Sequence, residues 1–233
     1  MAAPSDPASA LELRVRTSGA QPFLTWYEPA TGARVEFSAI TFANWVDKTA
    51  NLLGSLGFDD EPSVGIPLLV TDPCHWVGLV WTMATWQIGG RVVCLPRGAL
   101  DSVDVAVVGP REAHPVPGSE TVACSLHPLG LGFATPPAGV TDYREVLAEP
   151  DVHWSSDPAT AGFTDADRTR DWASICATRP SSERGLVIPG TDTWTWIAEA
   201  LVAPLLGGGS TVLVSGPVTD SGLDRIRADE RVG

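Results

Sequence analysis

Val64–Pro96 reads VGIPLLVTDPCHWVGLVWTMATWQIGGRVVCLP, and Arg184–Gly216 reads RGLVIPGTDTWTWIAEALVAPLLGGGSTVLVSG. The two stretches match as one unit written twice, with Thr71-Asp72 and Thr191-Asp192 separated by 120 residues (191 − 71). Each copy contains an apolar strand, a helix cap, a Trp-bearing apolar helix, glycines and a second apolar strand. Two strands joined by a helix form a βαβ unit, so the repeat predicts an α/β fold of layered sheets flanked by helices.

The length of 233 residues suits one large domain or two small ones. The first ten residues are small and polar, which predicts a flexible tail over 1–10. We expect residues 11–233 to form a single α/β domain with two βαβ lobes, at about 11–150 and 151–233.

The composition indicates an acidic globular protein. Hydrophobic residues make up 44% of the chain and charged residues 18%, enough apolar material for a core. The formal net charge of −13 repels a nucleic-acid backbone or an anionic membrane, so neither is expected as a partner. A polyanionic substrate would require a local cluster of arginines.

Cysteine spacing and the N-terminus predict a cytoplasmic protein. The four cysteines are scattered, without a CxxC pair or a His at ligand spacing, which predicts buried thiols and no metal site. Residues 1–10 lack the basic and apolar regions of a signal peptide. The longest apolar stretch, Trp76–Trp86, is too short to span a bilayer.

Periodicity and capping signals predict the remaining elements. We expect a short helix over 11–17, a hairpin of strands over 23–27 and 33–37, and a helix from Ser38 or Thr41 to Leu53. Asp72-Pro73 is expected to cap and open the helix that runs to Ile88. Further strands are expected over 92–95, 104–108 and 121–125. Helical segments are expected over 142–148, over 165–177 with Thr164 as the cap, and over 220–230.

Two residue types limit the chemistry. Trp76, Trp81 and Trp86 do not share one helix face, which favours core packing over an aromatic binding site. Lys48 is the one lysine among fifteen basic residues, and the apolar pattern of its helix predicts that it is solvated. The preference for Arg over Lys, with abundant Ala, Val, Gly, Pro and Asp, suggests a GC-rich bacterial genome.

Several segments together resemble the adenylate-forming superfamily, the acyl-CoA synthetases and their kin. FSAITFANWVDKTANLL (37–53) is similar to the first helix of that family, and the first βαβ unit to its next strand, helix and strand. DVAVVG (104–109) and AEALVAPLLGGGSTVLVSG (198–216) resemble later segments. The resemblance covers most of 21–217, implies the N-terminal part of the adenylate-forming fold, and is strongest to short actinobacterial relatives of AMP-binding enzymes.

The phosphate-binding loop of this family fits the chain poorly. That loop is rich in Ser, Thr and Gly and ends in Pro-Lys-Gly, so backbone N–H groups and a lysine surround the ATP phosphates. The best-placed stretch is Trp154–Thr164 (WSSDPATAGFT), where Ser155-Ser156 can stand for the opening Thr-Ser. It lacks the successive glycines and the lysine, so an ordinary surface loop is favoured there. Thr178–Gly185 (TRPSSERG) is an alternative placement with a single glycine.

Other motifs of the family have no counterpart. These are the Tyr-Gly-x-Thr-Glu segment that helps to hold magnesium, the Thr-Gly-Asp segment that holds the ribose, and the lysine of the small C-terminal domain. Adenylation needs compensation of the charge that develops on phosphorus. We therefore expect no catalytic residue, no metal site and no obligatory cofactor, while residual binding of ATP or AMP stays open.

The sequence leaves three hypotheses for the function. The leading hypothesis is a non-catalytic homologue that acts as a binding or regulatory protein, with an adenine nucleotide, an acyl ligand or a protein as partner. The alternatives are a half-enzyme completed by a partner chain and a self-associating structural protein, such as a homodimer. The residues expected near a retained cleft are Trp154, Ser155, Ser156, Thr191 and Asp192, of which the last two are favoured as helix caps. A ligand contact also remains open for His153.

Overall fold

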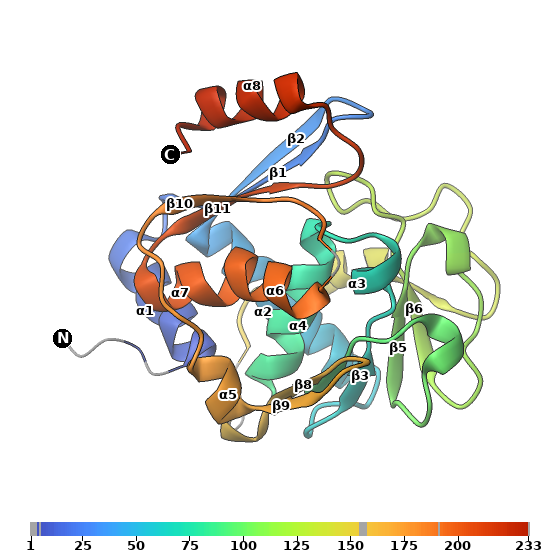
Figure 1. The fold of residues 1–233 in the computed structure, drawn as a ribbon. Helices are drawn as coiled ribbons and strands as arrows, with labels where there is room; N and C mark the ends of the chain where they lie inside the picture. The colour runs from blue at the N-terminus through green and yellow to red at the C-terminus, as the bar shows by residue number, and fades with distance from the viewer. Residues whose placement is uncertain (1–3, 5, 154–157, 191, 233) are drawn as a thin grey trace.

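The structure is a computed structural model that describes residue 4 and residues 6–153, 158–190 and 192–232 (Figure 1). Its strands form two sheets, one of four strands in the order β10-β11-β1-β2 and one of seven in the order β7-β6-β5-β3-β4-β8-β9. The strands of the first sheet are β1 (Pro22–Glu28), β2 (Ala33–Ser38), β10 (Arg184–Val187) and β11 (Ser210–Val214). Those of the second are β3 (Ser63–Gly65), β4 (Arg91–Val93), β5 (Val105–Val108), β6 (Glu120–Ala123), β7 (Thr141–Asp142), β8 (Gly162–Thr164) and β9 (Thr169–Asp171).

The helices vary widely in length. The α-helices are α1 (Pro7–Ser18), α2 (Ala39–Ser55), α3 (Leu68–Thr71), α4 (Trp76–Gln87), α5 (Trp172–Cys176), α6 (Thr193–Ile197), α7 (Ala203–Gly207) and α8 (Asp220–Glu230). Short 3-10 turns occur at η1 (Arg97–Ala99), η2 (Pro110–Glu112), η3 (Tyr143–Ala148) and η4 (Pro158–Thr160), and η5 (Ala198–Val202) is a π-helical turn between α6 and α7.

The repeated βαβ units are confirmed. β3 pairs in parallel with β4 after α3 and α4, and β10 pairs in parallel with β11 after α6, η5 and α7. The two units belong to different sheets, and each sheet contains strands from both before and after residue 150. β1 and β2 share a sheet with the late strands β10 and β11, while β8 extends the other sheet beside β4.

A layer of helices fills the space between the sheets (Figure 1). α2 contacts β1 and β2 on one side and α4 on the other, and α4 in turn contacts β4. Every residue of α4 is buried, because neighbours surround it on all sides. Trp76, Trp81 and Trp86 are each 0% exposed, so the prediction that they pack in the core is confirmed.

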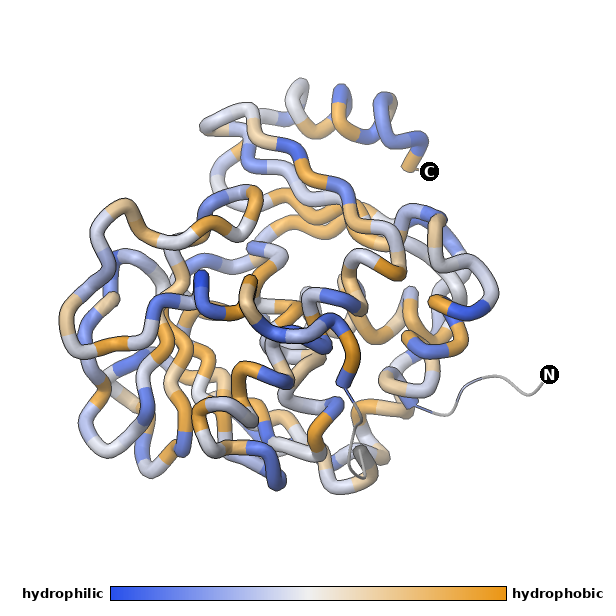
Figure 2. Tube along the Cα trace, turned by 180° about the vertical axis from the view of Figure 1, so that it is seen from behind, coloured by the Kyte–Doolittle hydropathy of each residue, from blue (hydrophilic) through white to orange (hydrophobic). Residues whose placement is uncertain are grey.

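The outer face of the four-stranded sheet is covered by α8. Ile226 of α8 packs with Val212 and Val214 of β11 in a small cluster of its own. Figure 2 shows apolar segments gathered in the interior below this helix, while α8 itself carries hydrophilic turns. Within the described residues, no helix combines the length and apolarity needed to cross a bilayer.

The starts of two helices differ from expectation. α1 begins at Pro7 instead of residue 11, because Asp6 caps it by accepting a hydrogen bond from the Ser9 N–H at 2.7 Å. Asp72-Pro73 does not open the long helix: Asp72 ends α3, and α4 begins at Trp76 with His75 as its cap. The chain therefore makes a short helix and a turn before α4, where the sequence predicts the end of a strand and a helix that opens at Asp72-Pro73.

The helix predicted over 165–177 is wrong. Thr164 lies in β8, which turns into β9, and only the five residues of α5 are helical, capped by Asp171. The expectation of a solvated Lys48 is also wrong, since its ammonium donates a hydrogen bond to the Glu149 carbonyl in a partly buried position. Of the four cysteines, Cys74, Cys94 and Cys124 are buried, as expected, and Cys176 is half-buried.

Candidate functional site

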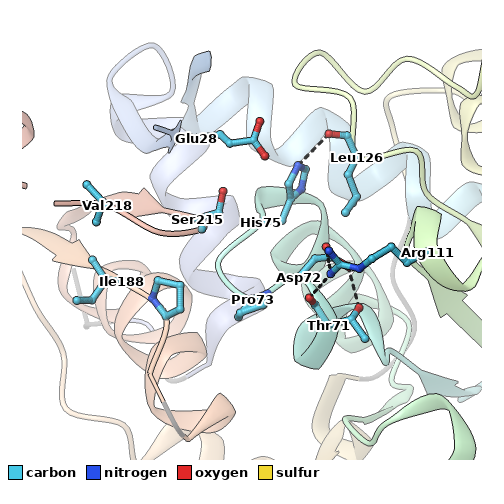
Figure 3. A pocket seen from close by; sticks show the side chains of 12 residues that line it. Glu28, Thr71, Asp72, Pro73, His75, Arg111, Leu126, Ile188, Ser215 and Val218 are labelled. Carbon is cyan, nitrogen blue, oxygen red and sulfur yellow. Dashed lines mark hydrogen bonds and ion pairs between the residues drawn. The ribbon is translucent and has the colours of Figure 1, made fainter. Parts of the chain in front are cut away.

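A pocket of about 450 Å³ lies where the carboxyl ends of parallel strands from both sheets meet (Figure 3). β1 ends at Glu28, β11 is followed by Ser215, and β10 is followed by Ile188. From the other sheet, the segments after β5 and β6 supply Arg111 and Leu126. Ligands of open α/β sheets bind at such strand ends, because loops from several strands converge there.

Arg111 is fixed at this pocket by the end of α3. Its Nη2 donates to the Asp72 Oδ1 at 2.7 Å and to the Thr71 carbonyl oxygen at 2.6 Å, and the Thr71 hydroxyl donates to the Asp72 Oδ2 at 2.8 Å. The Arg111 side chain remains 68% exposed, whereas that of Asp72 is 16% exposed. A Cβ at position 109 would lie 2.6 Å from the Asp72 Oδ2, so Gly109 leaves the space that this carboxylate occupies.

His75 lies on the wall of the pocket with both ring nitrogens engaged. Its Nδ1 accepts the Val77 N–H at 3.3 Å, so its Nε2 carries the proton and donates to the Leu126 carbonyl oxygen at 3.2 Å. The ring centroid is 4.7 Å from that of Trp26. Burial lowers the pKa of His75 to about 3, which keeps the ring neutral at pH 7. A neutral imidazole without a free nitrogen caps a helix and does not serve as a general base.

The other polar groups of the pocket are also occupied. The Ser215 hydroxyl donates to the Tyr27 carbonyl oxygen at 3.3 Å, and the Glu28 carboxylate accepts from the Thr31 hydroxyl at 2.5 Å. The other described lining residues are Thr71, Pro73 and five apolar or small residues that follow strand ends, namely Leu126, Ile188, Pro189, Gly216 and Val218. The pocket is thus an apolar cavity with two carboxylates and one arginine.

The residues predicted near a cleft fall mostly outside the described part of the chain. Trp154, Ser155, Ser156 and Thr191 are among the residues that the structure does not describe. Asp192 is described: it caps α6 by accepting the Thr195 N–H at 3.1 Å and the Thr195 hydroxyl, the role that the sequence favoured. Asp192 is not among the residues that line the pocket.

The sequence did not single out Arg111 or Ser215. The available signal was the repeat, because Thr71-Asp72 and Ile188 both lie between the first strand of a repeat and the helix that follows, α4 or α6. Arg111 follows β5, outside either repeat, and nothing in its local sequence distinguishes it. Over the described residues, no group of three or more His, Cys, Asp or Glu side chains is placed to hold a metal ion.

One curated protein establishes the kinship of the chain. A TIGR03089 family protein of Mycobacterium tuberculosis is 31% identical over 226 residues, which cover 89% of this chain and 88% of the relative. No family model matches the chain.

Solved structures with similar folds include acyl-CoA synthetases. Acetoacetyl-CoA synthetase from Streptomyces lividans aligns with a TM-score of 0.70 at 17% identity, over 97% of this chain and 41% of the enzyme. An acyl-CoA synthetase from Brucella canis gives 0.68 at 15% identity, over 97% and 46% of the two chains. A fatty acyl CoA synthetase from Mycobacterium tuberculosis gives 0.64 at 14% identity, over 98% and 48%.

These alignments confirm the expected fold. The chain spans less than half the length of each of these synthetases, and the low identities establish shared architecture, not shared activity. The expectation drawn from the helix, strand and glycine segments of the sequence, an N-terminal adenylate-forming fold, is therefore confirmed. This chain belongs to the TIGR03089 family, and its fold is that of the N-terminal part of the acyl-CoA synthetases.

Proposed function

We propose that this protein is a non-catalytic binding protein that holds a small acyl compound, carrying at most one negative charge, in the pocket at the strand ends. The solved relatives of this fold include an anthranilate CoA ligase in complex with anthranoyl-AMP, a compound with an acyl group. From that ligase we carry over to this chain only the binding of an acyl group, and not the adenylation chemistry.

The ion pair between Arg111 and Asp72 is the observation that carries the proposal. Arg111 is the one cation among the described residues that line the pocket, and its charge is offset by Asp72 while Glu28 adds a second negative charge. A magnesium triphosphate needs several N–H donors or cations around its phosphates. A pocket whose lining sums to one negative charge disfavours that ligand.

The apolar part of the lining favours an acyl chain. Leu126, Ile188 and Val218 face a volume of about 450 Å³, which is within the range of small-ligand sites. The Ile188 side chain is 43% exposed, so a ligand that covers it removes apolar surface from water. The exposed guanidinium of Arg111 retains N–H groups that no other described residue engages, and these can donate to a carboxylate or a carbonyl.

Thermal unfolding in the presence of ligands tests this function. Because a ligand that binds only the folded state raises the melting temperature, millimolar hexanoate and hexanamide should raise it and ATP with magnesium should not. Arg111→Gln should weaken hexanoate binding by about tenfold, because the charge-assisted hydrogen bond to the carboxylate is lost. The same variant should bind hexanamide within about twofold of wild type, because a neutral amide makes no such bond. Arg225→Gln, which removes an 84% exposed arginine on α8, is the matched control.

Two results would refute the proposal. One is pyrophosphate exchange catalysed by the isolated chain, which requires formation of an adenylate. The other is equal binding of hexanoate to wild-type protein and Arg111→Gln, which would show that hexanoate does not bind in this pocket.

A further inference from the structure

We propose that a second pocket, formed between α1 and α2 and closed by His153, binds a small organic cation: a primary ammonium on a short apolar chain. Its volume is about 480 Å³. α1 leads into the amino end of β1, whereas the acyl pocket lies at the carboxyl end of that strand. The inference does not depend on the proposed function, because the two pockets share no lining residue.

The walls of this second pocket are apolar. They come from one face of α1 and one turn of α2, with the side chains of Ala8, Leu11, Val15 and Ala43. Leu11 is 4% exposed and belongs to the core, so this wall is fixed by the packing of the whole molecule. Such a wall accepts a chain of a few methylene groups.

Asp47 places a negative charge at one end of these walls. It lies one helical turn after Ala43, so both side chains project from the same face of α2. The Asp47 Oδ1 accepts a hydrogen bond from the Gln87 Nε2 at 2.7 Å, which fixes the carboxylate. Among the described residues, no basic side chain forms an ion pair with it. Burial, and in smaller part the charge of Asp151, raises the pKa of Asp47 despite the hydrogen bond from Gln87.

His153 supplies a second acceptor. The Asn51 Nδ2 donates to the carbonyl oxygens of Pro150 and Val152 at 2.9 and 3.0 Å, which fixes the orientation of that amide. The Asn51 Oδ1 is therefore the acceptor for the His153 Nδ1 at 2.7 Å, and the His153 Nε2 is left with a lone pair. Burial lowers the pKa of His153, which keeps it neutral and able to accept.

The charge at the rim favours a cation over an anion. Glu12 and Arg16 pair at 3.1 Å with side chains that are 74% and 63% exposed, so they nearly cancel. Asp47 then leaves one net negative charge on a lining that also includes neutral His153. An ammonium group carries three N–H donors for acceptors of this kind, and the apolar walls favour an organic cation over a hydrated metal ion.

Calorimetric titration with three ligands of one size tests the proposal. n-Butylammonium should bind saturably at millimolar concentration, n-butanol at least fivefold more weakly, and butyrate not at all in this pocket. Asp47→Asn keeps an acceptor for Gln87 and should weaken n-butylammonium binding by about tenfold. Asp59→Asn makes the same change of net charge at an exposed position after α2 and should leave binding within about twofold.

A variant that fills the pocket distinguishes a loss of binding from a loss of folding. Ala43→Leu fills the wall without changing charge and should abolish n-butylammonium binding while the melting temperature stays within a few degrees of wild type. Equal affinity for n-butanol and n-butylammonium would overturn the proposal. So would equal effects of Asp47→Asn and Asp59→Asn, or loss of the binding in Arg111→Gln, since that variant alters only the other pocket.

Discussion

His75 connects the wall of the acyl pocket to the packing of the core. Its ring caps α4, donates to the carbonyl oxygen of Leu126 and lies against Trp26. An N-cap is ordinarily Ser, Thr, Asp or Asn, because their short side chains reach the free N–H groups of the first turn. This is why the sequence pointed to Asp72 as the cap, and why a buried imidazole in that role was not predicted.

The neutral state of His75 gives a stability that depends on pH. Its pKa is about 3 in the folded protein against 6.5 as the ordinary value, so below pH 6.5 the unfolded chain binds a proton that the folded chain excludes. Stability conferred by this group is complete above pH 6.5 and falls by about 1.4 kcal/mol per pH unit toward pH 3.

Replacement of His75 tests that linkage. His75→Asn can still cap the helix but loses the contact with Leu126, and we expect a cost of about 2 kcal/mol at pH 7. When urea unfolding is repeated, the gap between wild type and variant should shrink at pH 5.5 and change sign at pH 4.5, because wild type loses about 1.4 kcal/mol per pH unit. A gap that is constant over this range would show that His75 becomes protonated in the folded state as well.

At the scale of elements, the β8–β9 hairpin shows how local polar contacts replace a predicted helix. The Asp165 Oδ1 accepts the backbone N–H groups of Asp167 and Arg168, each at 3.0 Å, and its Oδ2 accepts the Arg170 Nη1 at 2.6 Å. A side chain that satisfies these backbone groups stabilises a turn. The guanidinium of Arg170 also lies 4.8 Å from the ring centroid of Trp194, a contact distant in sequence.

The Asp165–Arg170 pair is buried and should be costly to break. The two side chains are 10% and 7% exposed, so Asp165→Asn leaves a desolvated arginine without its counter-charge and should cost about 3 kcal/mol of unfolding free energy. Asp167→Asn, in the same turn, is the control and should change stability by less than about 0.5 kcal/mol. Chemical denaturation at pH 7 compares them, and similar values for the two variants would contradict this role of the pair.

Glu230 joins the C-terminal helix to the four-stranded sheet. Its carboxylate, with a side chain 7% exposed, accepts from the Tyr27 hydroxyl at 2.5 Å, from the Arg34 Nε at 2.9 Å and from Arg184. Burial opposes its ionisation, but these hydrogen bonds lower the pKa of Glu230 overall. The stability that it confers is therefore present above its ordinary pKa and is lost as the pH falls through the lower, folded value.

Removal of the Glu230 charge should release α8. Glu230→Gln places a neutral amide beside two arginines. We expect the free energy of unfolding to fall by about 3 kcal/mol and amide hydrogen exchange over 220–230 to become faster. Asp229→Asn removes a neighbouring carboxylate that is 60% exposed, and it should leave both measurements unchanged. If exchange over α8 were the same in the two variants, Glu230 would not be what attaches the helix.

At the scale of the whole molecule, the sequence predicted the architecture better than the site. The two βαβ units and the buried helix follow from patterns within about thirty residues, which local periodicity can report. The pairing of β1 with β11 joins segments nearly 190 residues apart, and no local pattern predicts it. The acyl pocket depends on the same long-range pairing, because Glu28 and Ser215 approach only when those strands are neighbours.

The balance of charge around the acyl pocket is the central claim, and calorimetric titration of the full chain tests it most directly. Magnesium ATP and hexanamide are titrated separately into wild-type protein at one ionic strength. With Arg111 already paired to Asp72, we expect saturable heat from hexanamide and none from magnesium ATP at millimolar concentration. Saturable binding of magnesium ATP that is lost in Arg111→Gln would contradict the account.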